Sequence, residues 1–169
     1  MNLHRNEIGE LWDKITPKLY GYLIHTLRDT ALADDILQAT WLKALEALPR
    51  FEERGHGKYG GLPAWLFSIA KNEMRMHWRK GGREIPYDPI IHDIPKDDRN
   101  NEDSHENNLL VEQVMKFLPK EDQELFRLRF IADLPIGEMA RVLGINPVSA
   151  RVKMHRALSR ARLILKQNI

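Results

Sequence analysis

The stretch that decides the fold of this chain runs from Pro135 to Ile169 and reads PIGEMARVLGINPVSARVKMHRALSRARLILKQNI. Its first part, Pro135 to Leu143, repeats apolar residues at helical spacing and predicts a short helix. Gly144 can take the left-handed conformation that ends a helix, Asn146 can cap the next helix, and Pro147 suits a first helical turn. Two helices joined by so short a turn cross steeply, so the stretch predicts a helix-turn-helix.

The second of these helices, from Pro147 to about Leu165, has two faces of different character. One face is apolar and is expected to pack: Ala150, Met154, Ala157, Leu158, Ala161 and Leu165. The opposite face is expected to be free: Val148, Ser149, Val152, His155, Arg156, Ser159 and Arg160. No acidic residue follows Glu138, whereas basic residues recur to the end of the chain, so a polyanion is the expected partner and the DNA major groove the expected site. The alternative is an arginine-rich helix that only packs on a bundle.

Composition narrows the class of protein. With 169 residues and 43% hydrophobic side chains, the chain is long enough for one domain or two small ones. Without cysteine there is neither a disulfide framework nor a thiolate site, as expected in a reducing compartment. No signal peptide and no apolar run of membrane-spanning length is recognisable, so we expect a cytoplasmic protein.

The N-terminal part predicts two amphipathic helices. The first runs from Glu7 to Leu27, and the second, with Thr30 as its expected cap, runs to Leu48. Its expected inner face consists of Ala33, Leu37, Trp41, Ala44 and Leu48. Its outer face sets Leu42 among acidic and amide groups, which favours a docking surface for a basic partner. Packing against another helix of the same bundle is an equally simple interpretation.

A glycine-rich loop from Pro49 to Leu62 precedes a third helix, from Pro63 to about Lys80. The pattern places Trp65, Leu66, Ile69, Asn72 and Met76 on one side of this helix. It places Phe67, Lys71, Met74, Arg75 and Trp78 on the other. Aromatic and cationic side chains that alternate in this way suit stacked bases and phosphates. For Phe67 and Trp78, each taken alone, packing in the core is an equally good interpretation.

The segment 83–108 holds three prolines and eight acidic residues and predicts a flexible linker. Its histidines and acids suggest a metal site only weakly, because no helical or strand register brings them together. Beyond it, a helix ending at Pro119 and another from Lys120 to Phe130 precede the helix-turn-helix. We therefore expect an all-α protein of two small helical domains, 1–82 and 109–169, joined by a flexible acidic linker, 83–108.

Three stretches resemble a known family. They are ALADDILQATWLKALEALPRF (31–51), LPAWLFSIAKNEMRMHWRK (62–80) and LPKEDQELFRLRFIADLPIGEMARVLGINPVSARVKMHRALSRAR (118–162). In order and spacing they resemble regions 2 and 4 of bacterial sigma factors of the extracytoplasmic-function (ECF) group. The resemblance covers nearly the whole chain apart from the linker. It is specific, because repressors with a helix-turn-helix lack the pattern formed by Asp34, Asp35, Gln38, Trp65 and Asn72.

This resemblance implies a specificity subunit of RNA polymerase with no enzymatic activity of its own and no cofactor or metal. The implied docking residues for the β′ clamp helices of core polymerase are Asp34, Asp35, Gln38, Ala39 and Leu42. The implied contacts to the single strand of the minus-10 element are Lys58, Tyr59, Lys71, Asn72, Arg75 and Arg79. The implied contacts to the minus-35 duplex are Ser149, Arg151, Val152, Lys153, His155, Arg156 and Arg160.

The resemblance also implies further partners. They are the β flap of the polymerase, promoter DNA and an anti-sigma factor, often membrane-anchored, that holds the protein inactive. Val152 departs from the small polar residue common at its position, which favours a thymine methyl or backbone contact there. His77 and Trp78 depart from the family pattern as well, which leaves the exact strand contacts open. The competing interpretations are a helix-turn-helix regulator that acts without polymerase and a metal-dependent enzyme that uses the His/Asp-rich middle segment.

Overall fold

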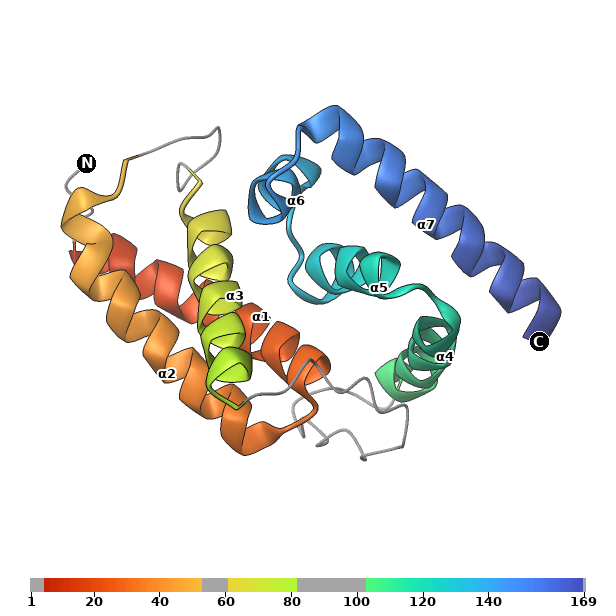
Figure 1. The fold of residues 1–169 in the computed structure, drawn as a ribbon, viewed down its shortest axis with the longest axis horizontal. Coiled ribbons are helices and arrows are strands. Elements are labelled where there is room, and N and C mark those ends of the chain that lie inside the picture. The colour runs from red at the N-terminus through yellow and green to blue at the C-terminus, as the bar shows by residue number, and fades with distance from the viewer. Residues whose placement is uncertain (1–4, 53–60, 82–102, 169) are drawn as a thin grey trace.

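The computed structural model describes residues 5–52, 61–81 and 103–168, and within those ranges it contains helices and no strand (Figure 1). The N-terminal unit consists of α1 (Arg5–Leu27), α2 (Thr30–Ala47), the 3₁₀ turn η1 (Leu48–Arg50) and α3 (Leu62–Lys80). The C-terminal unit consists of α4 (Asp103–Phe117), α5 (Lys120–Phe126), the π-helical turn η2 (Arg127–Ile131), α6 (Ile136–Leu143) and α7 (Pro147–Asn168). The all-α prediction is confirmed.

The N-terminal unit is a three-helix bundle in which α2 packs on both α1 and α3 (Figure 1). Leu11, Ile15, Leu19 and Leu23 follow one stripe of α1 and are all buried. The interior apolar face predicted for α2 is also found, with Trp41 among its buried residues. Each such side chain stabilises the fold by roughly 1.5–3 kcal/mol through removal from water. The bundle is therefore held mainly by apolar burial.

The cap of α2 differs from the prediction. Asp29, not Thr30, is the N-cap, and its Oδ1 accepts a hydrogen bond from the backbone N–H of Leu32 at 3.0 Å. Asp29 has the extended backbone that a capping residue needs, whereas Thr30 is already the first helical residue. The preceding residue, Arg28, turns the chain with a positive φ of 55°. The turn between α1 and α2 is thus one residue shorter than expected.

The two faces predicted for α3 are wrong in part. Phe67 and Met74 lie on the side that suits nucleic acid by its pattern, with Phe67 left open as a core residue, and both are buried, whereas Asn72 and Met76, on the opposite side, are exposed. Phe67 meets the ring of Tyr22 edge-on, with centroids 5.3 Å apart. The reason is that α3 is covered on two sides, by α2 and by α6 of the C-terminal unit. A single helical stripe cannot describe a helix buried on two sides.

The helix-turn-helix is confirmed in detail. Gly144 has φ 67° and ψ 31°, and the N–H groups of Gly144 and Ile145 bond back to the carbonyls of Arg141 and Ala140 at 3.2 and 3.0 Å, the pattern of a Schellman motif. Asn146 Oδ1 accepts a hydrogen bond from Ser149 N at 2.8 Å and so caps α7.

Two boundaries in the C-terminal unit differ from the prediction. The helix α4 begins at Asp103, inside the segment 83–108 that was predicted as linker. The helix predicted to reach Phe130 changes from α to π geometry at Arg127. Residues 82–102, and with them most of the predicted linker and its suggested metal ligands, lie outside the described residues.

Candidate polymerase and nucleic-acid interfaces

The first candidate interface is the outer face of α2, where apolar side chains lie beside acids. Asp34, Asp35 and Gln38 are exposed, Ala39 is half-buried, and Leu42 is 61% exposed. Leu45, which the sequence did not single out, is 50% exposed and lies one turn from Leu42. Exposed leucines in this pattern are typical of protein-binding surfaces, and the neighbouring carboxylates favour a basic partner.

The second candidate interface is the C-terminal half of α3. Asn72, Arg75 and Arg79 are exposed, as are the neighbouring His77 and Lys80. Lys71 differs from them, because its side chain is only 18% exposed and its Nζ lies 3.3 Å from Glu124 Oε1 of α5. The other two residues predicted to contact the minus-10 strand, Lys58 and Tyr59, lie outside the described residues.

A pocket of about 650 Å³ opens near the N-terminus of α3. Its lining combines aromatic and charged side chains: Arg50, Phe51, Glu52, Gly61, Ala64, Trp65, Ser68 and Arg141. The rings of Phe51 and Trp65 lie 4.8 Å apart, centroid to centroid. Aromatic surfaces of this kind can stack on a base. The sequence placed Trp65 on the side of α3 opposite Phe67 and did not indicate the pocket, because Phe51 and Arg141 come from distant parts of the chain.

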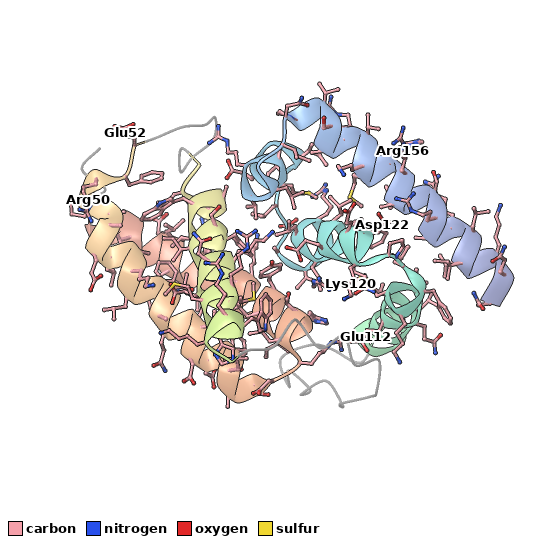
Figure 2. All side chains as sticks on the ribbon, viewed as in Figure 1. Arg50, Glu52, Glu112, Lys120, Asp122 and Arg156 are labelled. Atoms are coloured by element: carbon pink, nitrogen blue, oxygen red, sulfur yellow. The ribbon has the colours of Figure 1, made fainter. Side chains whose placement is uncertain are left out.

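The third candidate interface is the outer face of α7. Arg151, Val152, Lys153, His155 and Arg156 are exposed, and Ser149 is half-buried beside the cap. Figure 2 shows Arg156 on the side of α7 that faces away from α5. A helix with such a face, presented after a steep turn, has the form of a helix that enters the major groove.

Arg160 has a different environment from the other predicted minus-35 residues. Its Nη2 donates to Asp122 Oδ1 at 2.8 Å, and its Nε donates to Asp122 Oδ2. Asp122 is a buried residue of α5, so this bidentate pair ties α7 to α5. A role of Arg160 at the minus-35 element stays a prediction. In this structure two of its nitrogens bind within the protein.

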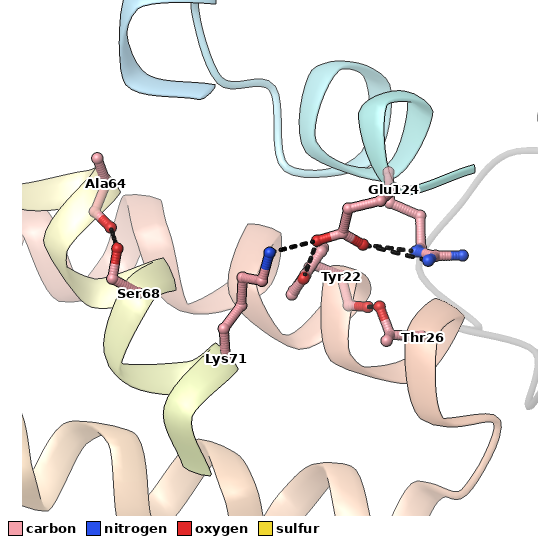
Figure 3. A network of polar contacts seen from close by, with 7 residues as sticks. Tyr22, Thr26, Ala64, Ser68, Lys71 and Glu124 are labelled. Carbon is pink, nitrogen blue, oxygen red and sulfur yellow. Dashed lines mark hydrogen bonds and ion pairs between the residues drawn. The ribbon is translucent and has the colours of Figure 1, made fainter. Parts of the chain in front are cut away.

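Glu124 is the centre of a polar network that joins the two units (Figure 3). It accepts hydrogen bonds from the hydroxyl of Tyr22 at 2.6 Å and from Arg127 at 3.1 Å, in addition to its ion pair with Lys71. Burial acts to raise the pKa of Glu124, but Arg127, Lys71 and the Tyr22 hydroxyl together hold it below its ordinary value. Burial, followed by the nearby Glu124 carboxylate, raises the pKa of Tyr22. Glu124 is therefore an anion at neutral pH.

The described residues contain no group of three or more histidine, aspartate or glutamate side chains arranged to hold a metal ion. None of the described helices combines the length and the apolar character that crossing a bilayer requires.

Two helical units, the second ending in a helix-turn-helix, define the class of a two-domain DNA-binding protein. The family model of sigma-70 region 2 matches residues 11–84, and that of sigma-70 region 4 matches residues 109–160. The chain belongs to the sigma-70 family, and within it to the ECF group.

Relatives of the chain include ECF sigma factors from several bacteria. It is 30% identical over 163 residues to the ECF RNA polymerase sigma factor BldN of Streptomyces coelicolor, an alignment that covers 92% of this chain and 60% of BldN. It is 28% identical over 170 residues to the ECF RNA polymerase sigma factor SigD of Mycobacterium tuberculosis, covering 94% of this chain and 76% of SigD. The chain thus spans less than two thirds of the length of BldN.

Two solved structures share the fold. The sigma factor RpoE of Bartonella quintana, in complex with the anti-sigma factor NepR, superposes with a TM-score of 0.68 at 22% identity, covering 95% of this chain and 98% of RpoE. CnrH, in complex with the cytosolic domain of CnrY, superposes with a TM-score of 0.66 at 20% identity, covering 98% of this chain and 92% of CnrH.

Proposed function

We propose that this chain is a sigma factor that binds core RNA polymerase, directs it to promoters with two recognition elements and helps to open the DNA, without a catalytic step of its own. The observation that carries the proposal is that sigma-70 regions 2 and 4 match the two helical units, in order, on one chain. A regulator that acts alone needs only a helix-turn-helix, whereas a region 2 unit serves a protein that works with polymerase.

The outer face of α2 is the proposed docking site for the β′ clamp helices. Leu42 and Leu45 supply apolar contact area, and Asp34, Asp35 and Gln38 supply polar contacts around it. The C-terminal unit is the proposed partner of the β flap. Acting with polymerase on chromosomal DNA, the protein would work in the cytoplasm.

The promoter is proposed to contact both units. Asn72, Arg75 and Arg79 of α3, with Lys58 and Tyr59 of the preceding loop, would hold the melted minus-10 strand. The exposed face of α7 around Arg151, Val152, Lys153, His155 and Arg156 would enter the major groove of the minus-35 element.

An anti-sigma factor is the proposed regulator of this protein. The similar sigma factor RpoE of Bartonella quintana was solved in complex with the anti-sigma factor NepR. The exposed apolar residues of α2 form a surface that such an inhibitor can cover in competition with polymerase.

Run-off transcription from a pool of promoter fragments, with core RNA polymerase and with or without this protein, tests the proposal. We expect transcripts that depend on the protein and share two upstream sequence elements. If no transcript depends on it, and the protein alone binds a specific duplex tightly, the chain is instead a helix-turn-helix regulator.

A further inference from the structure

The C-terminal unit packs against the N-terminal unit through apolar side chains. One buried cluster contains residues of both units, among them Leu19, Tyr22 and Phe67 from the first and Leu128, Leu134 and Met139 from the second. The turn η2 contacts α1, and α6 contacts α3. The two units therefore share part of one core.

A glycine permits the close approach of α1 to η2. A Cβ built on Gly21 would lie 3.3 Å from Cγ2 of Ile131, which is tighter than an ordinary contact. A larger side chain at this position would require Ile131 to shift by a few tenths of an ångström. Position 21 therefore allows the contact between the units to be tested without a change of charge.

Carboxylates of the C-terminal unit bind the same α3 that carries the predicted minus-10 residues. Glu138 Oε2 accepts a hydrogen bond from the backbone N–H of Ala64 at 3.0 Å, in the first turn of α3. Gly61 precedes this helix and has no side chain with which to cap it, so the cap comes from α6 instead. Two turns further along α3, Glu124 binds Lys71 (Figure 3).

The chemistry of these two contacts is that of phosphate binding. A helix N-terminus with unpaired N–H groups and a lysine two turns away on the same helix both attract an anion. In this structure each of them binds a carboxylate. A nucleic-acid phosphate that approaches Lys71 or the N–H of Ala64 must first displace Glu124 or Glu138.

We propose that the protein is autoinhibited, with Glu124 and Glu138 standing in for phosphates of the minus-10 strand, so that the C-terminal unit must leave α3 before this strand can bind. This inference rests on the proposed function, because it takes α3 as the strand-binding helix. It adds an inhibitory contact within the chain itself, separate from any anti-sigma factor. Core polymerase would favour the open form by engaging the two units separately.

The inference predicts how opening changes DNA affinity. Because the apparent Kd is the intrinsic Kd divided by the open fraction, a variant that opens more often binds single strands more tightly by the same factor. Glu124→Gln removes the charge that pairs with Lys71 but keeps an acceptor for Tyr22. We expect it to bind a fluorescent random single-stranded DNA of about 20 nucleotides several-fold more tightly than the wild type. Glu112→Gln on α4 removes the same charge away from α3 and is expected to change nothing.

A reversible crosslink provides the decisive measurement. The chain has no cysteine, so the pair Gly21→Cys and Ile131→Cys introduces its only thiols. A Cβ at position 21 lies 3.3 Å from Cγ2 of Ile131 and more than 4 Å from its Cβ, so the two Cβ atoms lie near or beyond the upper end of the range of about 3.5–4.5 Å that a disulfide spans. The oxidised full-length protein should bind the single-stranded probe about tenfold less tightly, or worse, than the same protein after reduction. Run-off transcription with core polymerase should be lost on oxidation and restored on reduction.

The possible outcomes distinguish a failure of the proposed autoinhibition from a failure of the proposed function. Equal binding and transcription in the oxidised state, with the disulfide formed, and in the reduced state would overturn the autoinhibition. Unchanged binding by a folded Glu124→Gln variant would remove Glu124 from the mechanism. If the reduced protein and the wild type support no transcription with core polymerase, the proposed function itself is wrong.

Discussion

Arg156 carries a prediction about promoter choice, because it lies exposed on the outer face of α7. We expect Arg156→Ala to weaken transcription that depends on the minus-35 element by about 1–3 kcal/mol of binding free energy. Run-off transcription from templates with an intact or a scrambled upstream element measures this effect. Arg162→Ala, which removes the same charge from another exposed position of α7, serves as the control. Equal effects of the two substitutions would show that only net charge matters.

His25 gives the fold a pH dependence. Burial, with help from Arg28 and Arg127, lowers the pKa of His25 from 6.5 to about 4. The unfolded chain therefore binds more protons than the folded chain between these values. The stabilising contribution of neutral His25 is fully present above about pH 6.5 and is lost as the pH falls toward 4.

Unfolding by urea at pH 7 and pH 5, followed by circular dichroism, measures this contribution. We expect the wild type to lose about 1–3 kcal/mol more stability on acidification than His25→Gln, at 1.4 kcal/mol per pKa unit and allowing for partial exposure. The comparison isolates His25 because both proteins keep the carboxylates that titrate in acid. Parallel losses in the two proteins would mean that His25 titrates normally in the fold.

Among the elements, α2 is predicted to supply the polymerase contact. We expect Leu42→Asp and Asp35→Lys each to abolish binding to core polymerase, because one puts a charge in the apolar contact and the other reverses a charge that faces a basic partner. Pull-down of core enzyme measures the loss, and circular dichroism checks the fold. The matched controls are Leu163→Asp on α7 and Asp13→Lys on α1, both at exposed positions. Full binding by the α2 variants would move the docking face elsewhere.

Two glycines in and after α6 should respond to alanine substitution with opposite changes in stability. A Cβ at Gly144 meets nothing within 4 Å, so Gly144→Ala acts only through the positive φ and should destabilise the fold by about 1–2 kcal/mol. Gly137 also has open space around it but lies inside α6, so Gly137→Ala should stabilise by up to about 1 kcal/mol. Thermal unfolding of both variants tests the signs. If both substitutions destabilise the fold, the positive φ of Gly144 does not explain the effect, and close backbone contacts do.

Signals that act within a few residues explain which elements could be predicted. Gly144, Asn146 and Pro147 define the turn of the helix-turn-helix by local backbone chemistry, and the structure matches them. The stripe of α1 and the exposed face of α2 followed from helical spacing alone. Local signals also have limits, because two neighbouring residues, Asp29 and Thr30, are both good caps and only the backbone decides between them.

On the scale of the whole molecule, contacts between distant residues are what the sequence could not provide. Phe67 was an equal candidate for core and interface until the positions of Tyr22 and α6 decided it. Arg160 looked like another member of a basic face, and its partner Asp122 lies 38 residues earlier in the chain. Lys71 was predicted to hold a phosphate, and nothing local to α3 indicates that Glu124 lies beside it. Charge patterns find the cations of a site but not the groups that already bind them.

The apolar seam between the two units makes their association sensitive to temperature. Leu128, Leu134 and Met139 are buried in the same cluster as Leu19 and Phe67, so separating the units exposes hydrocarbon to water. Such exposure carries a positive heat-capacity change, and the apolar part of the association free energy weakens on cooling. Cooling therefore shifts the equilibrium between the closed and the open form toward the open form, so the apolar contact between the units makes this equilibrium respond to temperature.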